Sequence, residues 1–146
     1  MTPVRILLAD DHPIVRDGLK MLLDLQPDMT VVAAVKNGVE ALNQVHMDCP
    51  DIAILDIGMP EMNGIDCAAE MHHLYPQIQI IMLSMHDTSE YIIRAIQAGA
   101  KGYLLKDSLS QEIVRAIHTV HMGNYIVSKK IARLLTTLEV MDKAKR

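Results

Sequence analysis

The chain has 146 residues, half of them apolar and 22% charged, with a formal net charge of −4 at pH 7. This apolar content excludes a disordered chain, and the length suits one domain with its own core. The negative charge gives the chain no electrostatic attraction for DNA. No apolar run approaches the roughly 18 residues of a membrane span, and the short apolar start runs straight into acids, unlike a secretory signal. Cys49 and Cys67 lack metal-binding or redox spacing, so we expect free thiols in a cytoplasmic protein.

Short apolar or β-branched runs recur along the chain and predict the strands of a sheet. Two of them, VRILLA and IAIL, have the character of strands that are buried on both faces. Turn-forming residues separate these runs from the segments that follow. In chain order, the predicted strands are residues 4–9, 30–35, 51–55, 79–83 and 103–105.

Segments with apolar residues at helical spacing follow each predicted strand. Pro13 suits a first helical turn, Asn37-Gly38 turns the chain into the second helix, and Pro76 closes the third. In chain order, the predicted helices begin at residues 13, 38, 65, 89 and 108 or 110, and a sixth segment covers 128–142. The residues expected to face inward on the third and fourth helices are Ile65, Ala68, Ala69, His72, Ile92, Ala95 and Ile96.

Five successive strand–helix units predict an α/β fold, a parallel sheet with helices on both faces and right-handed crossovers. Only the sixth helical segment lies beyond these units. We therefore expect a sheet domain at residues 1–126 and a C-terminal helix at 127–146. The apolar face of this helix needs a partner, which could be the domain itself, a second protomer or a further domain. That face carries Ile131, Leu134, Leu135 and Leu138.

Four of the five predicted strands end in residues that can handle phosphate or metal. Parallel strands bring these ends to one edge of the sheet, where open α/β folds bind ligands. Three carboxylates there would repel each other, and a hard cation such as Mg²⁺ would relieve the repulsion. One carboxylate could then act as a nucleophile, while a lysine and a hydroxyl contact phosphoryl oxygens. The residues are Asp10, Asp11, Asp56, Ser84 and Lys106.

Each of these residues alone has an ordinary explanation, since carboxylates cap helices and serines or lysines occur in turns and loops. Their coincidence at one sheet edge is what favours a functional site. A second candidate is weaker. His118 and His121 lie three apart on a predicted helix, which could suit a metal, but no third ligand is apparent in the sequence.

The segments LLADDHPIVRDGL, DIAILDIGMPEMNG, IIMLS and AGAKGYLLKD together resemble a receiver domain of a two-component response regulator, over residues 3–125. The wording DDHPIVRDGL and AGAKGYLLKD is most similar to the NarL/LuxR-type subfamily, whose members usually carry a C-terminal helix-turn-helix domain. The resemblance implies a flavodoxin-like, doubly wound sheet of five strands in the order 2-1-3-4-5. It also implies a bacterial phosphorylation switch with self-catalysed phosphoryl transfer and slow autodephosphorylation, and not a conventional enzyme.

The resemblance implies a role for each charged residue at the sheet edge. Asp56 would be the phosphoacceptor, and Lys106 would contact its phosphoryl group. Asp11 would ligate Mg²⁺ directly together with Asp56 and the Gly58 carbonyl, and Asp10 would act through water. Mn²⁺ could substitute for Mg²⁺.

Further residues are implied in switching and in the lifetime of the phosphate. Ser84 and Tyr103 would be the switch pair, with Ser84 drawn towards the phosphate and Tyr103 turning inward. Gly58 and His86 would line the path of the attacking water. Many receivers have proline after the lysine, joined by a cis peptide bond. Asp107 follows here, so we expect a trans bond.

The implied partners are a sensor histidine kinase, a second copy of the chain after phosphorylation, and DNA through a C-terminal domain outside this sequence. No membrane contact is expected. A stand-alone receiver that acts through protein contacts is the alternative within the family. A haloacid-dehalogenase-type phosphatase would share the Asp, Ser, Lys and Mg²⁺ but needs a second Asp where this chain has Gly58. A nucleotide-binding module would need a glycine-rich loop after a strand, which the sequence lacks.

Overall fold

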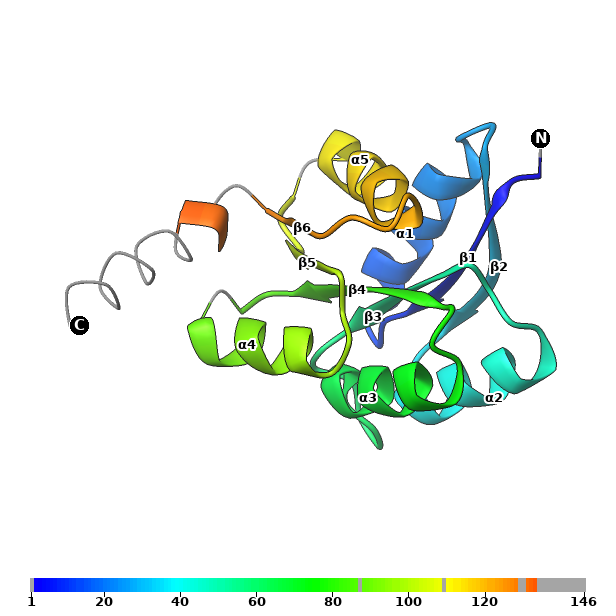
Figure 1. Ribbon diagram of the computed structural model, residues 1–146. Coiled ribbons are helices and arrows are strands. Elements are labelled where there is room, and N and C mark those ends of the chain that lie inside the picture. The colour runs from blue at the N-terminus through cyan, green and yellow to red at the C-terminus, as the bar shows by residue number, and fades with distance from the viewer. Residues whose placement is uncertain (1, 87, 109, 129–130, 134–146) are drawn as a thin grey trace, which may run out of the picture.

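The computed structural model describes residues 2–86, 88–108, 110–128 and 131–133. Strands and helices alternate along this part of the chain (Figure 1). The elements are β1 (Val4–Ala9), α1 (Pro13–Asp24), β2 (Met29–Val35), α2 (Gly38–Met47), β3 (Ile52–Asp56), α3 (Gly64–Leu74), β4 (Gln79–Ser84), α4 (Ser89–Gln97), β5 (Gly102–Leu105), α5 (Ser110–His121) and β6 (Ile126–Val127). Each of the five predicted strands starts within one residue of an observed strand.

Helix starts follow from local hydrogen bonding. Asn37 and Asn63 precede α2 and α3, and each side chain accepts a hydrogen bond from a backbone N–H of the first turn, at 2.8 Å. These bonds satisfy donors that a helix cannot satisfy internally. Pro13 opens α1, where its missing N–H costs nothing. The Asn-Gly pairs at residues 37–38 and 63–64 therefore mark the starts of α2 and α3.

The strands form one parallel sheet in the order β2-β1-β3-β4-β5-β6. The first five strands have the predicted order, which is confirmed. The sixth strand was not predicted. It pairs with β5 through Gly102 and Tyr103, and the backbone N–H of Ser128 donates to the Tyr103 carbonyl at 3.1 Å. A two-residue strand is too short to show any periodicity, so the sequence pattern could not reveal it.

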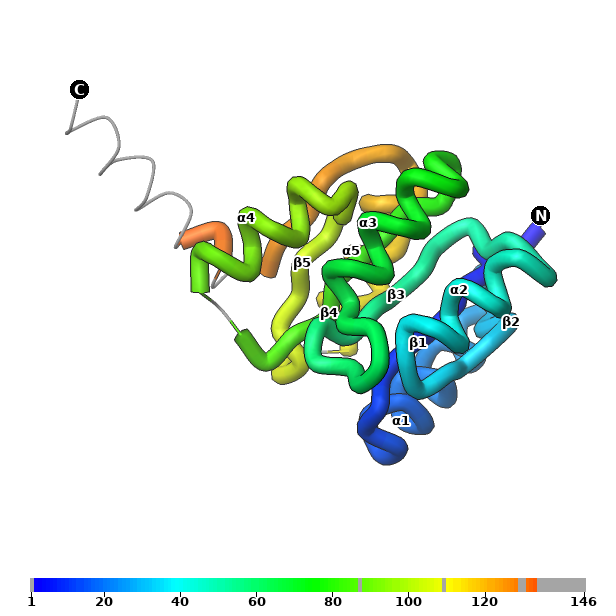
Figure 2. The backbone as a smooth tube through the Cα atoms, turned by 90° about the horizontal axis from the view of Figure 1, so that it is seen from below, coloured from blue at the N-terminus to red at the C-terminus, as the bar shows by residue number. Residues whose placement is uncertain are grey.

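Helices cover both faces of the sheet. Figures 1 and 2 show α1 and α5 on one face and α2, α3 and α4 on the other. The central strand β3 is buried along its whole length, and its side chains alternate between the two faces. Ile52 and Ile54 join the apolar cluster under α1 and α5, whereas Ala53 and Leu55 join the cluster under α2, α3 and α4.

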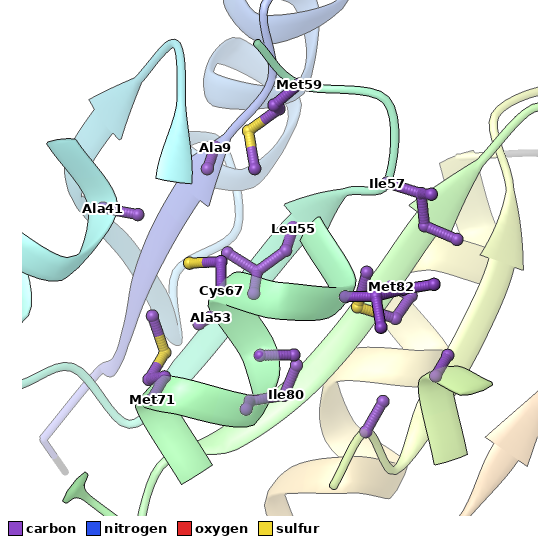
Figure 3. Packing of buried hydrophobic residues seen from close by; sticks show 14 of the residues in the cluster. Ala9, Ala41, Ala53, Leu55, Ile57, Met59, Cys67, Met71, Ile80 and Met82 are labelled. Carbon is purple, nitrogen blue, oxygen red and sulfur yellow. The ribbon is translucent and has the colours of Figure 1, made fainter. Parts of the chain in front are cut away.

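Sulfur-containing side chains are part of the cluster under α2, α3 and α4. The sequence has no Phe or Trp, and Figure 3 shows Met59, Met71, Met82 and Cys67 packed among small aliphatic residues. Unbranched methionines adapt to irregular gaps that aromatic rings would otherwise fill. Fully burying a side chain of this size contributes about 1.5–3 kcal/mol before the cost of ordering it. Both cysteines are free thiols, as predicted.

Two helices differ in part from their predicted buried faces. On α3, Ala69 and His72 are exposed, and the buried positions are taken by Cys67 and Met71 as well as Ile65 and Ala68. On α4, Ile96 is 42% exposed. The predictions for Ala69, His72 and Ile96 were wrong because these helices carry apolar residues on more than one face, so periodicity alone does not fix which residues are buried. Ile65, Ala68, Ile92 and Ala95 are buried as predicted.

The predicted C-terminal helix lies largely outside the described residues, including Leu134, Leu135 and Leu138. The predicted domain boundary after residue 126 stays a prediction, and Val127 itself belongs to β6. Residues 131–133 are helical, and Ile131 is fully buried in the cluster under α2, α3 and α4. The domain itself is therefore the partner of this first apolar residue. Among the described residues, no helix combines the length and apolar character that a membrane span requires.

Candidate functional site

The C-terminal ends of four strands meet at one edge of the sheet. Asp10 directly follows β1, Asp56 and Ser84 are the last residues of β3 and β4, and Lys106 directly follows β5. The strand register aligns these ends, pairing Ala9 with Leu55, Asp56 with Leu83 and Ser84 with Leu105. Residues far apart in the sequence therefore converge, as the strand pattern predicted.

Lys106 holds two of the carboxylates together. Its Nζ lies 3.0 Å from Asp56 Oδ2 and 3.2 Å from Asp10 Oδ2, and the lysine side chain is only 9% exposed. The side chains of Asp10 and Asp56 are almost wholly buried as well. Partly exposed Asp11 lies beside them, so the pocket holds three carboxylates against one buried ammonium. This excess of negative charge would be stabilised by a further cation.

Burial raises the pKa of Asp56 above its ordinary value. The hydrogen bond from Lys106 opposes this shift, the nearby charge of Asp10 adds to it, and the Gly58 N–H, 3.2 Å from Asp56 Oδ1, opposes it. Burial is the largest of these causes and prevails. Positive charge placed beside Asp56 would lower this pKa and so favour the ionised form that a nucleophile needs.

The pocket contains side chains that could bind a divalent cation. Asp10 Oδ2, Asp11 Oδ1 and Asp56 Oδ2 are buried, and among the described residues their close polar contacts are with Lys106 and His12. Together with His12, these residues offer ligand atoms that all lie within 4.8 Å of one another. Carboxylate oxygens suit Mg²⁺ and Mn²⁺. The predicted role of the Gly58 carbonyl as a ligand stays a prediction.

The other histidine candidate does not form such a group. In the described part of the chain, His118 and His121 belong to no cluster of three potential ligands. His118 Nε2 instead lies 3.3 Å from Asp28 Oδ2, an exposed pairing between α5 and the loop before β2.

His12 is the site residue that the sequence analysis missed. It is the N-cap residue of α1, but its side chain makes no capping hydrogen bond. Instead, His12 Nδ1 lies 3.1 Å from Asp10 Oδ1 and 3.3 Å from Asp11 Oδ1, and 3.8 Å from Asp56 Oδ2. Its place between an acidic pair and Pro13 in the run DDHP was the available signal.

The predicted switch residues are linked through one backbone segment. The Tyr103 hydroxyl donates to the His86 carbonyl at 2.8 Å, and the His86 N–H donates to Ser84 Oγ at 2.9 Å. The His86 ring stacks on Tyr91 of α4, with centroids 4.7 Å apart. Tyr103 is 1% exposed and so already lies inward in this structure. The inward position that the switch prediction assigns to the Tyr103 ring is therefore already occupied in this structure.

Two glycines shape the loop after Asp56. A Cβ on Gly58 would meet nothing within 4 Å, which agrees with the expected open approach to the acceptor. A Cβ on Gly64 would overlap the backbone carbonyl of Asp56, so only glycine lets α3 begin this close to β3. In the described residues, all peptide bonds are trans, including the bond between Lys106 and Asp107.

A family model described as the response regulator receiver domain matches residues 6–118. The chain belongs to this family. The resemblance predicted from the sequence motifs is thereby confirmed, and so is the predicted fold class.

Named relatives and solved structures agree with this assignment. The chain is 38% identical over 133 residues to the oxygen regulatory protein NreC of Staphylococcus epidermidis, covering 90% of this chain and 61% of NreC. It is 32% identical over 132 residues to the transcriptional regulatory protein DegU of Brevibacillus brevis, covering 90% of this chain and 56% of DegU. A two-component response regulator of the LuxR family from Aurantimonas superposes with a TM-score of 0.91 and 33% identity, over 95% of this chain and 99% of that chain. This receiver chain thus spans about three-fifths of the curated relatives it matches.

Proposed function

We propose that this domain is a phosphorylation-activated switch of a two-component system and that Asp56 accepts a phosphoryl group from a sensor histidine kinase. The observation that carries the proposal is the convergence of Asp10, Asp11, Asp56 and Lys106 at one sheet edge. In the transfer, the bond between phosphorus and the kinase histidine nitrogen breaks, and a bond between phosphorus and an Asp56 carboxylate oxygen forms.

The protein's contribution to this transfer is position and charge. Lys106 stands 3.0 Å from Asp56 Oδ2, where its ammonium can neutralise charge on the transferred phosphoryl oxygens. Asp10, Asp11 and Asp56 would hold Mg²⁺, with Mn²⁺ as a substitute, and the bound cation supplies further positive charge to those oxygens. Ser84, the last residue of β4, would contact a phosphoryl oxygen through its hydroxyl, and we describe the domain as catalysing its own phosphorylation and slow dephosphorylation.

The output is proposed from the relatives. DegU is named a transcriptional regulatory protein, and it and NreC extend well beyond the length that this chain matches. We propose that this receiver controls transcription in the bacterial cytoplasm through a C-terminal DNA-binding domain reached by the linker at residues 127–146. A stand-alone receiver acting through protein contacts remains the second arrangement within the family.

Acetyl phosphate labelling tests the proposal. With Mg²⁺ present, the wild-type protein should gain one acid-labile phosphate, and Asp56→Asn should gain none while keeping the circular dichroism of a folded domain. Asp17→Asn is the matched control, because Asp17 is an exposed carboxylate on α1. Undiminished labelling of folded Asp56→Asn protein would refute the assignment of the acceptor.

A further inference from the structure

The hydroxyl of Ser84 ends β4 and has little of its own to fix its direction. Serine lacks the second branch at Cβ that restricts χ1 in threonine. Ser84 Oγ accepts a hydrogen bond from the backbone two residues on, the His86 N–H at 2.9 Å, and a local turn of this kind is weak by itself. A serine hydroxyl that has to meet a phosphoryl oxygen therefore depends on support from its surroundings.

The bond from His86 also determines what the hydroxyl hydrogen can do. A hydroxyl has one hydrogen to donate and two lone pairs that accept. The His86 N–H occupies a lone pair of Ser84 Oγ, and this contact does not use the hydrogen. Ser84 is 1% exposed, so little solvent competes for that hydrogen. The arrangement is thus one in which the hydroxyl can donate to a phosphoryl oxygen without first giving up its existing bond.

Three contacts hold His86 in place. Its N–H donates to Ser84 Oγ, and its carbonyl accepts from the Tyr103 hydroxyl at 2.8 Å. Its ring stacks on the Tyr91 ring, with centroids 4.7 Å apart and planes 21° apart, a favourable geometry for two aromatic rings. His86 is an exposed residue, so solvent alone would leave its ring free to rotate, and the stack restrains it.

Tyr91 is a firm support because it is anchored in the core. It lies in the first turn of α4 and packs against the apolar cluster under α2, α3 and α4. Its neighbours Ile92 and Ala95 on the same helix are fully buried. A chain of contacts therefore runs from the core through the rings of Tyr91 and His86 to the hydroxyl of Ser84.

We propose that Tyr91 is a positioning residue for phosphoryl transfer, because its stack on His86 directs the Ser84 hydroxyl towards the phosphoryl group. A donor that is already oriented costs no reorganisation when the reaction occurs. The proposal deepens the proposed function, since it rests on phosphorylation of Asp56 and on the contact of Ser84 with the phosphoryl group. It adds a residue that lies on a helix, outside the acidic pocket, and acts only through its neighbours.

The initial rate of labelling by acetyl phosphate at saturating Mg²⁺ tests the proposal. Tyr91→Leu keeps an apolar side chain against the cluster but loses the stack, and should slow labelling about two- to tenfold, the factor that one aromatic pair is worth. Tyr91→Phe keeps the ring and should label at the wild-type rate. In a Ser84→Ala background, Tyr91→Leu should have no further effect, because the tyrosine acts through the hydroxyl. Mg²⁺ affinity should be the same in all of these proteins.

Ile93→Ala is the matched control. Ile93 lies on the same helix and is 47% exposed, and a residue two positions along a helix faces another direction. This variant should label at the wild-type rate, because it truncates an apolar side chain of α4 without touching the stack.

Amide hydrogen exchange of His86, followed by NMR without a phosphodonor, reads the contact chain directly. Exchange should be faster in Tyr91→Leu and Ser84→Ala than in the wild type and in Tyr91→Phe. Unchanged exchange or an unchanged labelling rate in Tyr91→Leu would overturn the proposal, as would a full effect of that variant in the Ser84→Ala background. A wild-type protein that is not labelled at all would instead refute the proposed function, and the exchange measurement would still decide whether Tyr91 orders this segment.

Discussion

Asp56 combines burial with a neighbouring carboxylate, and its raised pKa has a consequence for stability. A carboxyl group whose folded pKa exceeds its unfolded value of 3.8 contributes stability in acid, and this contribution is lost as the pH rises through the folded pKa. In EDTA at neutral pH, we therefore expect Asp56→Asn to raise the free energy of unfolding by about 1–3 kcal/mol, the scale of a desolvation cost, because the neutral amide avoids the burial of a charge and the repulsion from Asp10. Urea unfolding measures this gain, which should shrink towards acid pH. A less stable variant at neutral pH would contradict it.

Cys67 gives a pH dependence of its own. Burial raises the pKa of its thiol from 9.0 to about 12. Since the folded pKa is the higher one, the stability is fully present below pH 9 and is lost as the pH rises towards 12. We expect a loss of about 1.4 kcal/mol per pH unit in this window, from this residue alone.

The Cys67→Ser variant isolates the effect, because serine keeps a donor for the Gly38 carbonyl and does not titrate. Subtracting its pH profile from that of wild type removes the contribution of every other alkaline group. Identical slopes in the two proteins would mean that the thiol ionises as freely in the folded state as in the unfolded chain.

Gly58 leaves space beside the acceptor, and nothing lies within 4 Å of the position of a Cβ there. In the proposed mechanism, the water that hydrolyses the phosphorylated Asp56 approaches through this space. We expect Gly58→Arg to slow the decay of the acid-labile phosphate several-fold, because the long side chain obstructs that approach. Gly58→Ala is too short to reach and serves as the control. Unchanged or faster decay in the arginine variant would refute the open approach.

At the scale of elements, two helical glycines have opposite expected effects. Gly18 lies exposed within α1, and a Cβ there would meet nothing within 4 Å, so Gly18→Ala should stabilise the domain by about 0.5–1 kcal/mol. Gly64 begins α3 against the Asp56 carbonyl, so Gly64→Ala should destabilise it and disturb the acceptor. Thermal unfolding of both variants compares the effects directly. Equal shifts of the same sign would mean that the close approach of α3 to β3 is unimportant.

The elements also show how far sequence reasoning extends. Long apolar runs such as β3 and the residues that end them predicted a parallel sheet and the convergence of Asp56 with Lys106 at one edge of it, whereas the strand order was implied by the family resemblance. Periodicity failed where several faces were apolar, as at Ala69 and Ile96, and where a strand had only two residues. His12 was not identified as a site residue from the sequence. His12 is at the N-cap position of α1, but its side chain makes no capping hydrogen bond, and no periodic sequence pattern shows where such a side chain points.

At the scale of the whole molecule, this chain has a negative net charge of −4, and the relatives it matches are longer. We therefore expect no sequence-specific DNA binding by the 146-residue chain at physiological salt. Fluorescence anisotropy with regulatory DNA and scrambled DNA checks this. A higher affinity for one sequence would overturn the expectation and place the DNA-binding surface within the receiver itself.

Phosphorylation is expected to promote a symmetric dimer through the helical surface of the domain. Sedimentation velocity over a range of concentrations, with and without acetyl phosphate and Mg²⁺, measures the change. Asp56→Asn should sediment as the unphosphorylated protein does under both conditions. Phosphorylated wild-type protein that stays monomeric at the highest concentration would exclude this mode of output.

The pairing of β6 with β5 determines where an attached domain would pivot. After α5, the chain does not leave the sheet freely, because Ile126 and Ser128 donate their N–H groups to the carbonyls of Lys101 and Tyr103. The hinge of an attached downstream domain would thus lie beyond Ile131, which is buried against the domain, and β6 itself is paired with β5, the strand that carries Tyr103 of the predicted switch pair. Residues inserted before β6 would lengthen a surface loop and leave the hinge in place, whereas residues inserted after residue 133 would move the attached domain further from the receiver.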